Sequence, residues 1–254
     1  MSWCDKLAST PTVGFRLSTH FAPIEIILDA WAPILDRASE DDAKNTTVEQ
    51  PQTFYGIGVI TREGFKYSAD ESKISVAFQH RTKVRATSGG PPRMEMLSTP
   101  MPFTALMPVV EARLIEATLL LPKAKDRSVQ RVGVISTTAI AEEDLPPGIK
   151  RFVSYVGRPW KADYLDSFNI TITADISVTG GIKERCVHTI AKSEDKEQLM
   201  TLQFDWQRLF DDGWQITQAN LERVLQGARK GALAYFEDLA EGNRFDEILI
   251  SSTT

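Results

Sequence analysis

The residues best suited to binding chemistry in this sequence are cations, which gather in one short stretch. Six basic side chains and no acidic one lie between Lys73 and Arg93, in a chain whose formal net charge is −5. If this stretch forms a strand, Arg81, Lys83 and Arg85 lie on one face, roughly 7 Å apart. We call these three residues the basic stripe. That spacing suits a nucleic-acid backbone.

The basic stripe also has a simpler interpretation, as the charged and soluble face or edge of a sheet. No aromatic residue shares its predicted face, whereas grooves for single-stranded nucleic acid usually interleave cations with stacking rings. We therefore favour the simpler interpretation and keep anion or nucleic-acid binding as the alternative.

A second group of basic residues is predicted to lie in a loop. The segment VGRPWKADYLDSF, from Val156 to Phe168, contains Arg158, Trp160 and Lys161. Aromatic rings beside cations can clamp an anionic or nucleotide ligand, and the same composition also serves protein interfaces and anchors loops. Together with the basic stripe, these three residues form the candidate site for an anion or nucleic acid.

No catalytic residue emerges from the sequence. Cys186 and His188 are two residues apart on a predicted strand, so they share a face and could pair as thiolate and base. The neighbouring Ile190 indicates that this face is half-buried instead. The acidic clusters at 142–144 and 211–212 are predicted to lie in loops, where carboxylates are usually solvated. An enzyme with an unrecognised site is therefore the least favoured hypothesis.

Two charged residues are predicted to lie within strands. Arg131 opens the sequence RVGV, and Asp205 lies on the strand face opposite Phe204 and Trp206. A charged side chain in a central strand requires a partner. We expect Asp205 to form a structural pair with an arginine such as Arg131, and a functional site there is the alternative.

Composition and missing motifs exclude several classes of function. The chain has 254 residues, of which 42% are hydrophobic, enough for a core without disulfides or metals. The sequence contains no P-loop, dinucleotide fingerprint, HExxH, GxSxG, CxxC or calcium loop. Its two cysteines share no motif spacing. We expect no cofactor, no metal and no membrane span, and a cytoplasmic location.

Hydrophobic periodicity predicts strands followed by a helix in each half of the chain. In the first half we expect strands at 13–17, 24–31, 54–61, 65–69 and 74–87, a loop at 36–52, a turn at 88–93 and a helix over 104–121 capped by Thr104. In the second half we expect strands at 129–138, 168–178, 182–191 and 200–206, a loop at 141–149, and a helix from Thr217 to Gly242.

This order of elements predicts the α+β class. We expect two strand-rich halves, residues 1–125 and 126–254, each with an antiparallel sheet closed by a helix and both packed as one unit. The repeated order suggests a diverged duplication.

Four short motifs resemble a family of uncharacterised, conserved hypothetical proteins of about this length, distributed sporadically over bacteria, archaea and phages. They are Ala22-Pro23-Ile24-Glu25-Ile26, Arg131-Val132-Gly133-Val134, Leu202-Gln203-Phe204-Asp205-Trp206 and Tyr235-Phe236-Glu237. Their order covers nearly the whole chain. Ala22 and Gln203 depart from the residues common in that family, so the chain would be a divergent member. The resemblance implies no catalytic residue.

The leading functional hypothesis is a non-catalytic protein-binding or scaffolding component that contacts another protein or a second copy of itself. A sporadic distribution is typical of mobile-element cargo, so the resemblance implies a complex subunit in a mobile-element or phage-defence system. A sensor or binder of an anionic ligand or nucleic acid is the alternative, with nucleic acid the less favoured partner.

Overall fold

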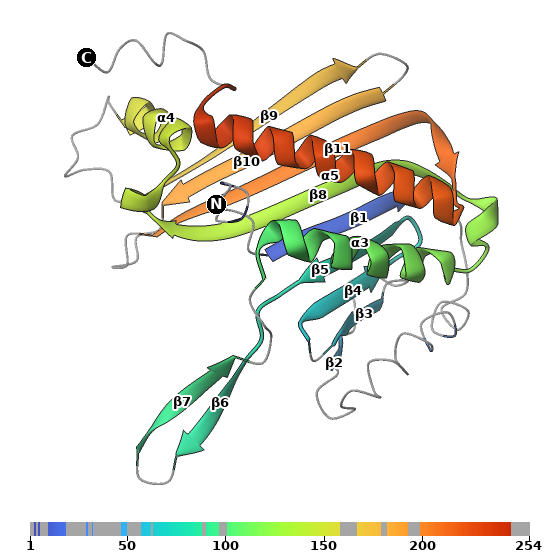
Figure 1. The fold of residues 1–254 in the computed structure, drawn as a ribbon, viewed down its shortest axis with the longest axis horizontal. Helices are drawn as coiled ribbons and strands as arrows, with labels where there is room; N and C mark the ends of the chain where they lie inside the picture. The colour runs from blue at the N-terminus through green and yellow to red at the C-terminus, as the bar shows by residue number, and fades with distance from the viewer. Residues whose placement is uncertain are drawn as a thin grey trace.

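An antiparallel sheet forms the centre of the computed structural model (Figure 1). The structure describes residues 3, 5, 10–18, 29, 32, 47–49, 57–61, 63–87, 90–96, 101–157, 167–178, 182–192 and 199–244. Within this part of the chain, nine strands form one sheet in the order β2-β3-β4-β5-β1-β8-β11-β10-β9, and every pairing is antiparallel.

The strands of this sheet come from both halves of the chain. They are β1 (Thr10–Leu17), β2 (Thr47–Glu49), β3 (Ile57–Ile60), β4 (Phe65–Ala69), β5 (Lys73–Phe78), β8 (Ser128–Ala141), β9 (Phe168–Val178), β10 (Ile182–Lys192) and β11 (Leu199–Gln215). Because β1 pairs with both β5 and β8, the two predicted halves share one continuous sheet. The α+β class is confirmed, and the duplication stays a prediction.

Two long helices, α3 (Phe103–Leu119) and α5 (Gln218–Glu241), cover one face of the sheet (Figure 1). Helix α3 contacts β1 and β5, and α5 contacts β8 and β11. Strand alternation supplies the sheet side of this core, where Phe15, Val134 and Trp206 are almost fully buried. Gly231 of α5 lies against the Trp206 ring, so a side chain there would prevent the close approach. The shorter α4 (Pro147–Gly157) packs beside α5.

The ends of α5 agree with the sequence prediction. The Thr217 side chain accepts a hydrogen bond from the Asn220 backbone amide at 3.2 Å, and Gly242 ends the helix with a left-handed φ of 92°. The predicted cap of α3 is wrong, because Pro102 occupies the cap position and Thr104 lies inside the first turn. The carboxylate of Asp5 accepts hydrogen bonds from the Thr104 amide and hydroxyl.

The predicted strand at 74–87 is interrupted. Strand β5 ends at Phe78, and β6 (Thr82–Thr87) begins a separate hairpin with β7 (Gly90–Met96) that projects from the body (Figure 1). The prediction that Pro91 and Pro92 cannot lie in a strand is also wrong. Both lie on the register shift between the pairs Arg85↔Arg93 and Thr87↔Gly90, where a missing amide hydrogen costs no regular ladder bond.

Three smaller predictions also differ from the structure. Asp29 has helical backbone where a strand was expected, and the flanking residues 24–28, 30 and 31 lie outside the described part of the chain. The loop predicted at 141–149 contains the short 3-10 helix η2 (Glu142–Asp144) and the start of α4, with Pro147 at its first position. Asp211 and Asp212 lie within β11, at a bulge where its register against β8 shifts.

Candidate functional site

The predicted anion site lies only partly within the described residues. Arg81 lies in the connection between β5 and β6, where its Nη1 donates a hydrogen bond to the Thr61 carbonyl at 2.9 Å. Lys83 and Arg85 lie on β6, in register with Glu95 and Arg93. The basic stripe therefore does not follow one straight strand. Arg158, Trp160 and Lys161 lie outside the described residues.

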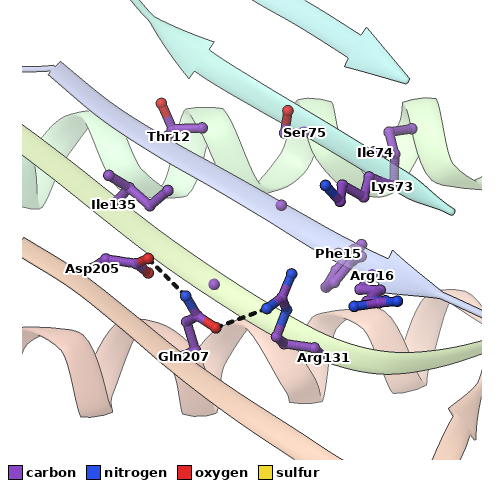
Figure 2. A pocket seen from close by; sticks show the side chains of 12 residues that line it. Thr12, Phe15, Arg16, Lys73, Ile74, Ser75, Arg131, Ile135, Asp205 and Gln207 are labelled. Carbon is purple, nitrogen blue, oxygen red and sulfur yellow. Dashed lines mark hydrogen bonds between the residues drawn. The ribbon is translucent and has the colours of Figure 1, made fainter. Parts of the chain in front are cut away.

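A different polar site lies on the sheet face opposite α3 and α5, which we call the open face. A hollow of about 290 Å³ lies over β5, β1, β8 and β11 (Figure 2). This volume is close to the lower end of the range for small-ligand sites, roughly 300–1,000 Å³. The residues that line it are Thr12, Gly14, Phe15, Arg16, Lys73, Ile74, Ser75, Arg131, Gly133, Ile135, Asp205 and Gln207.

Three cations lie side by side across the strands at one end of the hollow. In the register of the sheet, Arg16 of β1 lies directly opposite Lys73 of β5 on one side and Arg131 of β8 on the other. We call Lys73, Arg16 and Arg131 the cation row. Among the residues that the structure describes, no ion pair joins Arg16 or Lys73 to a carboxylate. Like charges directly opposite each other destabilise a sheet, so this arrangement does not favour folding.

The charges of the cation row influence one another. Burial, followed by the neighbouring charge of Arg16, lowers the pKa of Arg131, and the carboxylate of Asp205 opposes this change. An arginine keeps its proton in spite of such a shift. The charge of Arg16 therefore disfavours the charged form of Arg131, and a bound anion would offset this effect.

Two glycines form the floor of the hollow beside the cation row. Gly14 and Gly133 are direct cross-strand partners, each two residues from an arginine of the row. At Gly14 an added Cβ would lie 2.9 Å from the Ile74 carbonyl oxygen, so packing requires a glycine. At Gly133 an added Cβ would meet nothing closer than the Gln207 Cγ at 3.8 Å. Packing does not require Gly133, and its missing side chain keeps the hollow deep.

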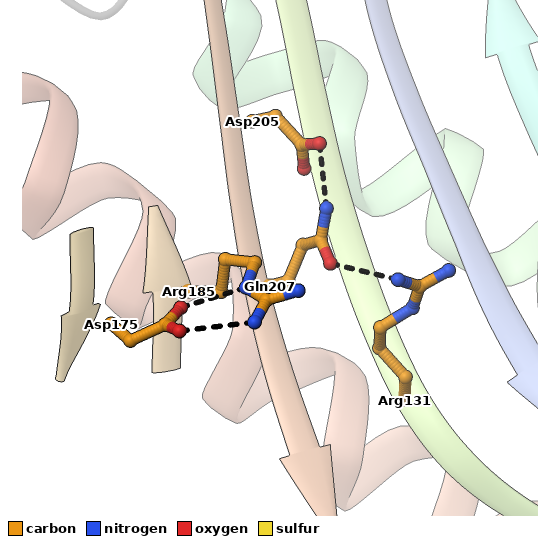
Figure 3. Close-up of polar contacts among 5 residues, drawn as sticks. All are labelled: Arg131, Asp175, Arg185, Asp205 and Gln207. Carbon is orange, nitrogen blue, oxygen red and sulfur yellow. Dashed lines mark hydrogen bonds and ion pairs between the residues drawn. The ribbon is translucent and has the colours of Figure 1, made fainter. Parts of the chain in front are cut away.

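Gln207 of β11 connects Arg131 to Asp205 (Figure 3). Arg131 Nη1 donates to Gln207 Oε1 at 2.9 Å, and Gln207 Nε2 donates to Asp205 Oδ2 at 2.6 Å. The sequence predicted a direct pair between Arg131 and Asp205, but the structure places an amide between them. This chain of hydrogen bonds holds the Arg131 guanidinium in place and leaves its other N–H groups for a ligand.

Asp205 marks the other end of the hollow. Its Oδ1 is shielded from solvent and has no hydrogen-bond partner among the described residues. Burial raises the pKa of Asp205, whereas the hydrogen bond from Gln207 and the charge of Arg131 lower it. Nearby on the same face, Arg185 forms a two-pronged ion pair with Asp175 at 2.7 and 3.0 Å (Figure 3). The open face is therefore cationic at one end of the hollow and carries a carboxylate at the other.

The pair of Cys186 and His188 lacks the environment of a catalytic thiolate. Both side chains are buried on the helix-covered face of β10, as their spacing predicted. Burial raises the pKa of the Cys186 thiol to about 11, and burial lowers the pKa of His188. His188 Nδ1 lies 3.0 Å from the Tyr235 hydroxyl, so it takes part in a core hydrogen bond. These observations favour a structural role for the pair.

The described residues offer little other chemistry. The described residues contain no group of three or more side chains placed to share a metal ion. Within the same part of the chain, none of the helices combines the length and the apolar composition that crossing a membrane requires. Comparisons with protein-family models, with curated proteins and with solved structures gave no match. The resemblance to the sporadic family therefore stays a prediction.

The sequence contained one signal that could have revealed the cation row. Strand β1 reads Gly14-Phe15-Arg16, and β8 reads Arg131-Val132-Gly133, which is the mirror image. In an antiparallel pair such mirrored sequences place glycine against glycine and arginine against arginine. The signal becomes meaningful only when the two strands are known to be neighbours.

Proposed function

We propose that the protein binds an anionic ligand on the open face of its sheet, at the cation row. The observation that carries this proposal is the juxtaposition of Lys73, Arg16 and Arg131 on three neighbouring strands, at the edge of a hollow. Three like charges without a described carboxylate partner at Arg16 or Lys73 oppose folding. A ligand that neutralises them would recover this free energy on binding.

The chemistry of the hollow supports an anion rather than a neutral ligand. Arginine and lysine side chains supply charge-assisted hydrogen bonds, the strongest kind available to a phosphate or carboxylate group. The hydroxyl group of Ser75 adds a neutral donor one row from the cations, and that of Thr12 lies at the other end of the hollow, in the row of Asp205. The hollow on the open face is suited to binding a ligand. The residues that line it do not include a nucleophile paired with a base.

A thermal unfolding experiment tests the proposal. We expect phosphate and citrate to raise the melting temperature of the wild-type protein, since a ligand that binds only the native state stabilises it. Without added anion, the double variant Arg16→Gln/Lys73→Gln should melt at or above the wild-type temperature because a repulsion is removed. With anion, it should lose the ligand-dependent increase.

The double variant Lys150→Gln/Lys230→Gln is the matched control. It removes two positive charges from exposed positions on α4 and α5, outside the open face. We expect it to keep the anion-dependent increase in melting temperature. An equal loss in both variants would show that net charge causes the effect, and the proposed site would be wrong.

A protein-binding or scaffolding role remains a second proposal, which the β6–β7 hairpin favours. This hairpin stands outside the nine-stranded sheet and projects from the body (Figure 1). Projecting hairpins give a partner an accessible surface. Replacing residues 82–96 by a short Gly-Ser linker and measuring the molar mass by light scattering tests self-association. If the variant and the wild-type protein have the same molar mass at every concentration, the hairpin does not bind a second copy of the chain.

A further inference from the structure

The geometry of the cation row also indicates the kind of anion. This inference rests on the proposed function above. Strand partners in a sheet are roughly 5 Å apart, so the Cα atoms of Lys73, Arg16 and Arg131 form a line across three strands that is roughly 10 Å long. A single phosphate or carboxylate group can contact only part of a line of this length. A chain of adjacent anionic groups could contact all of it.

The direction of the line separates two kinds of polyanion. Successive phosphates on a stretched nucleic-acid strand would suit the longer spacing of alternate residues along one β-strand, roughly 7 Å. The cation row instead runs across the strands with the shorter spacing. Phosphates that share a bridging oxygen lie closer together than phosphates separated by a sugar, and the long Lys and Arg side chains of neighbouring strands can converge on such a compact chain.

Carboxylates confine the anionic chain to the row. Two rows further along the strands, the backbone of Asp205 lies opposite Ile135, roughly 13 Å from the backbone of the cation row, and its carboxylate reaches back to Gln207, the hydrogen-bond partner of Arg131. Its negative charge disfavours an anion that extends along the strands toward it. Further along the same line of register, beyond Leu209 of β11, Lys183 of β10 lies 4.0 Å from Asp211. The cation row therefore ends at Arg131.

We propose that the cation row binds a linear polyphosphate chain, such as that of a nucleoside triphosphate, laid across β5, β1 and β8. Arg16 at the centre contacts the middle of the chain, and Lys73 and Arg131 contact its two ends. Gln207 accepts a hydrogen bond from one edge of the Arg131 guanidinium. This bond fixes the direction of the remaining N–H donors of Arg131. The hollow over Gly14 and Gly133 leaves space for a group attached to one end of the chain.

Titration calorimetry of the full chain with inorganic phosphate, pyrophosphate, tripolyphosphate and ATP tests this proposal, in buffer without divalent cations. Each additional phosphate that reaches a cation gains charge-assisted hydrogen bonds, so tripolyphosphate should bind at least about tenfold more tightly than phosphate. Arg16→Gln should remove most of this gain because it divides the row. The slope of log affinity against log salt should fall by about one for the lost cation.

Lys183→Gln is the matched control, since it removes one positive charge from the same line of register but from outside the row. We expect its tripolyphosphate affinity to stay within about twofold of the wild-type value, a change too small to indicate a lost direct contact. Arg16→Gln relieves a repulsion, so it should fold, and a thermal melt will verify this. An equal loss of affinity in both variants would overturn the proposal.

The remaining outcomes separate this inference from the proposed function. If phosphate binds as tightly as tripolyphosphate and Arg16→Gln weakens both equally, the protein binds single anions and only the polyphosphate inference is wrong. If none of the probes binds but citrate raises the melting temperature, only the polyphosphate inference is wrong, and if citrate also has no effect, both proposals are wrong. If an oligonucleotide without terminal phosphates binds more tightly than tripolyphosphate, the ligand is a nucleic-acid backbone and the inference is overturned.

Discussion

Glu111 gives the most quantitative prediction about the stability of this fold. It lies on α3 with 8% of its surface exposed, and its Oε2 is 3.2 Å from Arg229 Nη1 on α5. Its Oε1 is buried without a hydrogen-bond partner among the described residues. Burial raises the pKa of Glu111 from 4.5 to about 7, although the charge of Arg229 opposes the shift. The native state therefore binds this proton more tightly than the unfolded state.

The sign of the pH dependence follows from this difference. Between pH 4.5 and about 7 the native protein holds a proton that the unfolded chain has released, so stability falls as the pH rises. One pKa unit corresponds to 1.36 kcal/mol, so the shift of Glu111 lowers the free energy of unfolding by about 3 kcal/mol over this window. The contribution is fully present below pH 4.5 and is lost as the pH passes through 7.

The variant Glu111→Gln tests this reasoning because glutamine keeps the shape of the protonated acid but does not titrate. We would measure urea unfolding of both proteins by circular dichroism from pH 4.5 to 8. The stability of the variant relative to wild type should rise by about 3 kcal/mol over this range. The same substitution at the exposed Glu222 controls for the lost negative charge. A difference between Glu111→Gln and wild type that stays constant with pH would refute the argument.

Three further predictions concern single residues of the sheet and its helix layer. Gly133→Ala should be neutral or stabilise the protein by about 0.4–1 kcal/mol, since the hollow has room for a methyl group. Gly231→Ala should lower the free energy of unfolding by roughly 1–3 kcal/mol, because its Cβ would lie 2.4 Å from the Trp206 ring. Urea unfolding of both glycine variants tests this difference, and destabilisation of both would contradict the packing argument. In a Cys4→Ser background, Cys186 should react with a thiol reagent at pH 8 about a hundredfold more slowly in the native than in the unfolded protein. Equal rates would show that the thiol is accessible.

The sequence predicted the second half of the fold most accurately. The strand expected at 168–178 is β9 with the same bounds, and Met200, Leu202, Phe204 and Trp206 share the buried face of β11 as expected. Helix α5 begins after Thr217 and ends at Gly242. These elements have strong local signals, namely uninterrupted alternation, a side-chain cap and a glycine stop.

The sequence failed where a distant segment changes the local preference. Asp5 supplies the carboxylate at the start of α3, so Thr104 is not its cap. The backbone carbonyl of Thr61 accepts a hydrogen bond from Arg81, which lies where the chain leaves the sheet and the predicted strand ends. Pro91 and Pro92 lie in a strand because they coincide with a register shift of the hairpin. The partners of Asp5 and Arg81 lie 99 and 20 positions away in sequence, whereas the register shift of the hairpin is local.

The cation row shows the same division between local pattern and tertiary structure. Alternation along β1 and β8 already places Arg16 and Arg131 on strand faces opposite buried residues. The sequence also predicted that Asp205 lies away from the core and needs a polar partner. It could not show that β1 lies between β5 and β8, or that Gln207 connects Arg131 to Asp205.

The sequence by itself therefore determined the type of most elements and, within the correctly predicted strands, the face on which Arg16, Arg131 and Asp205 lie. These properties depend on residues two to four positions apart, within reach of a local pattern. Only the tertiary structure decided which strands are neighbours and in what register. Register brings Lys73, Arg16 and Arg131 into one line although 115 residues separate the last two, because pairing depends on the packing of the whole sheet against α3 and α5.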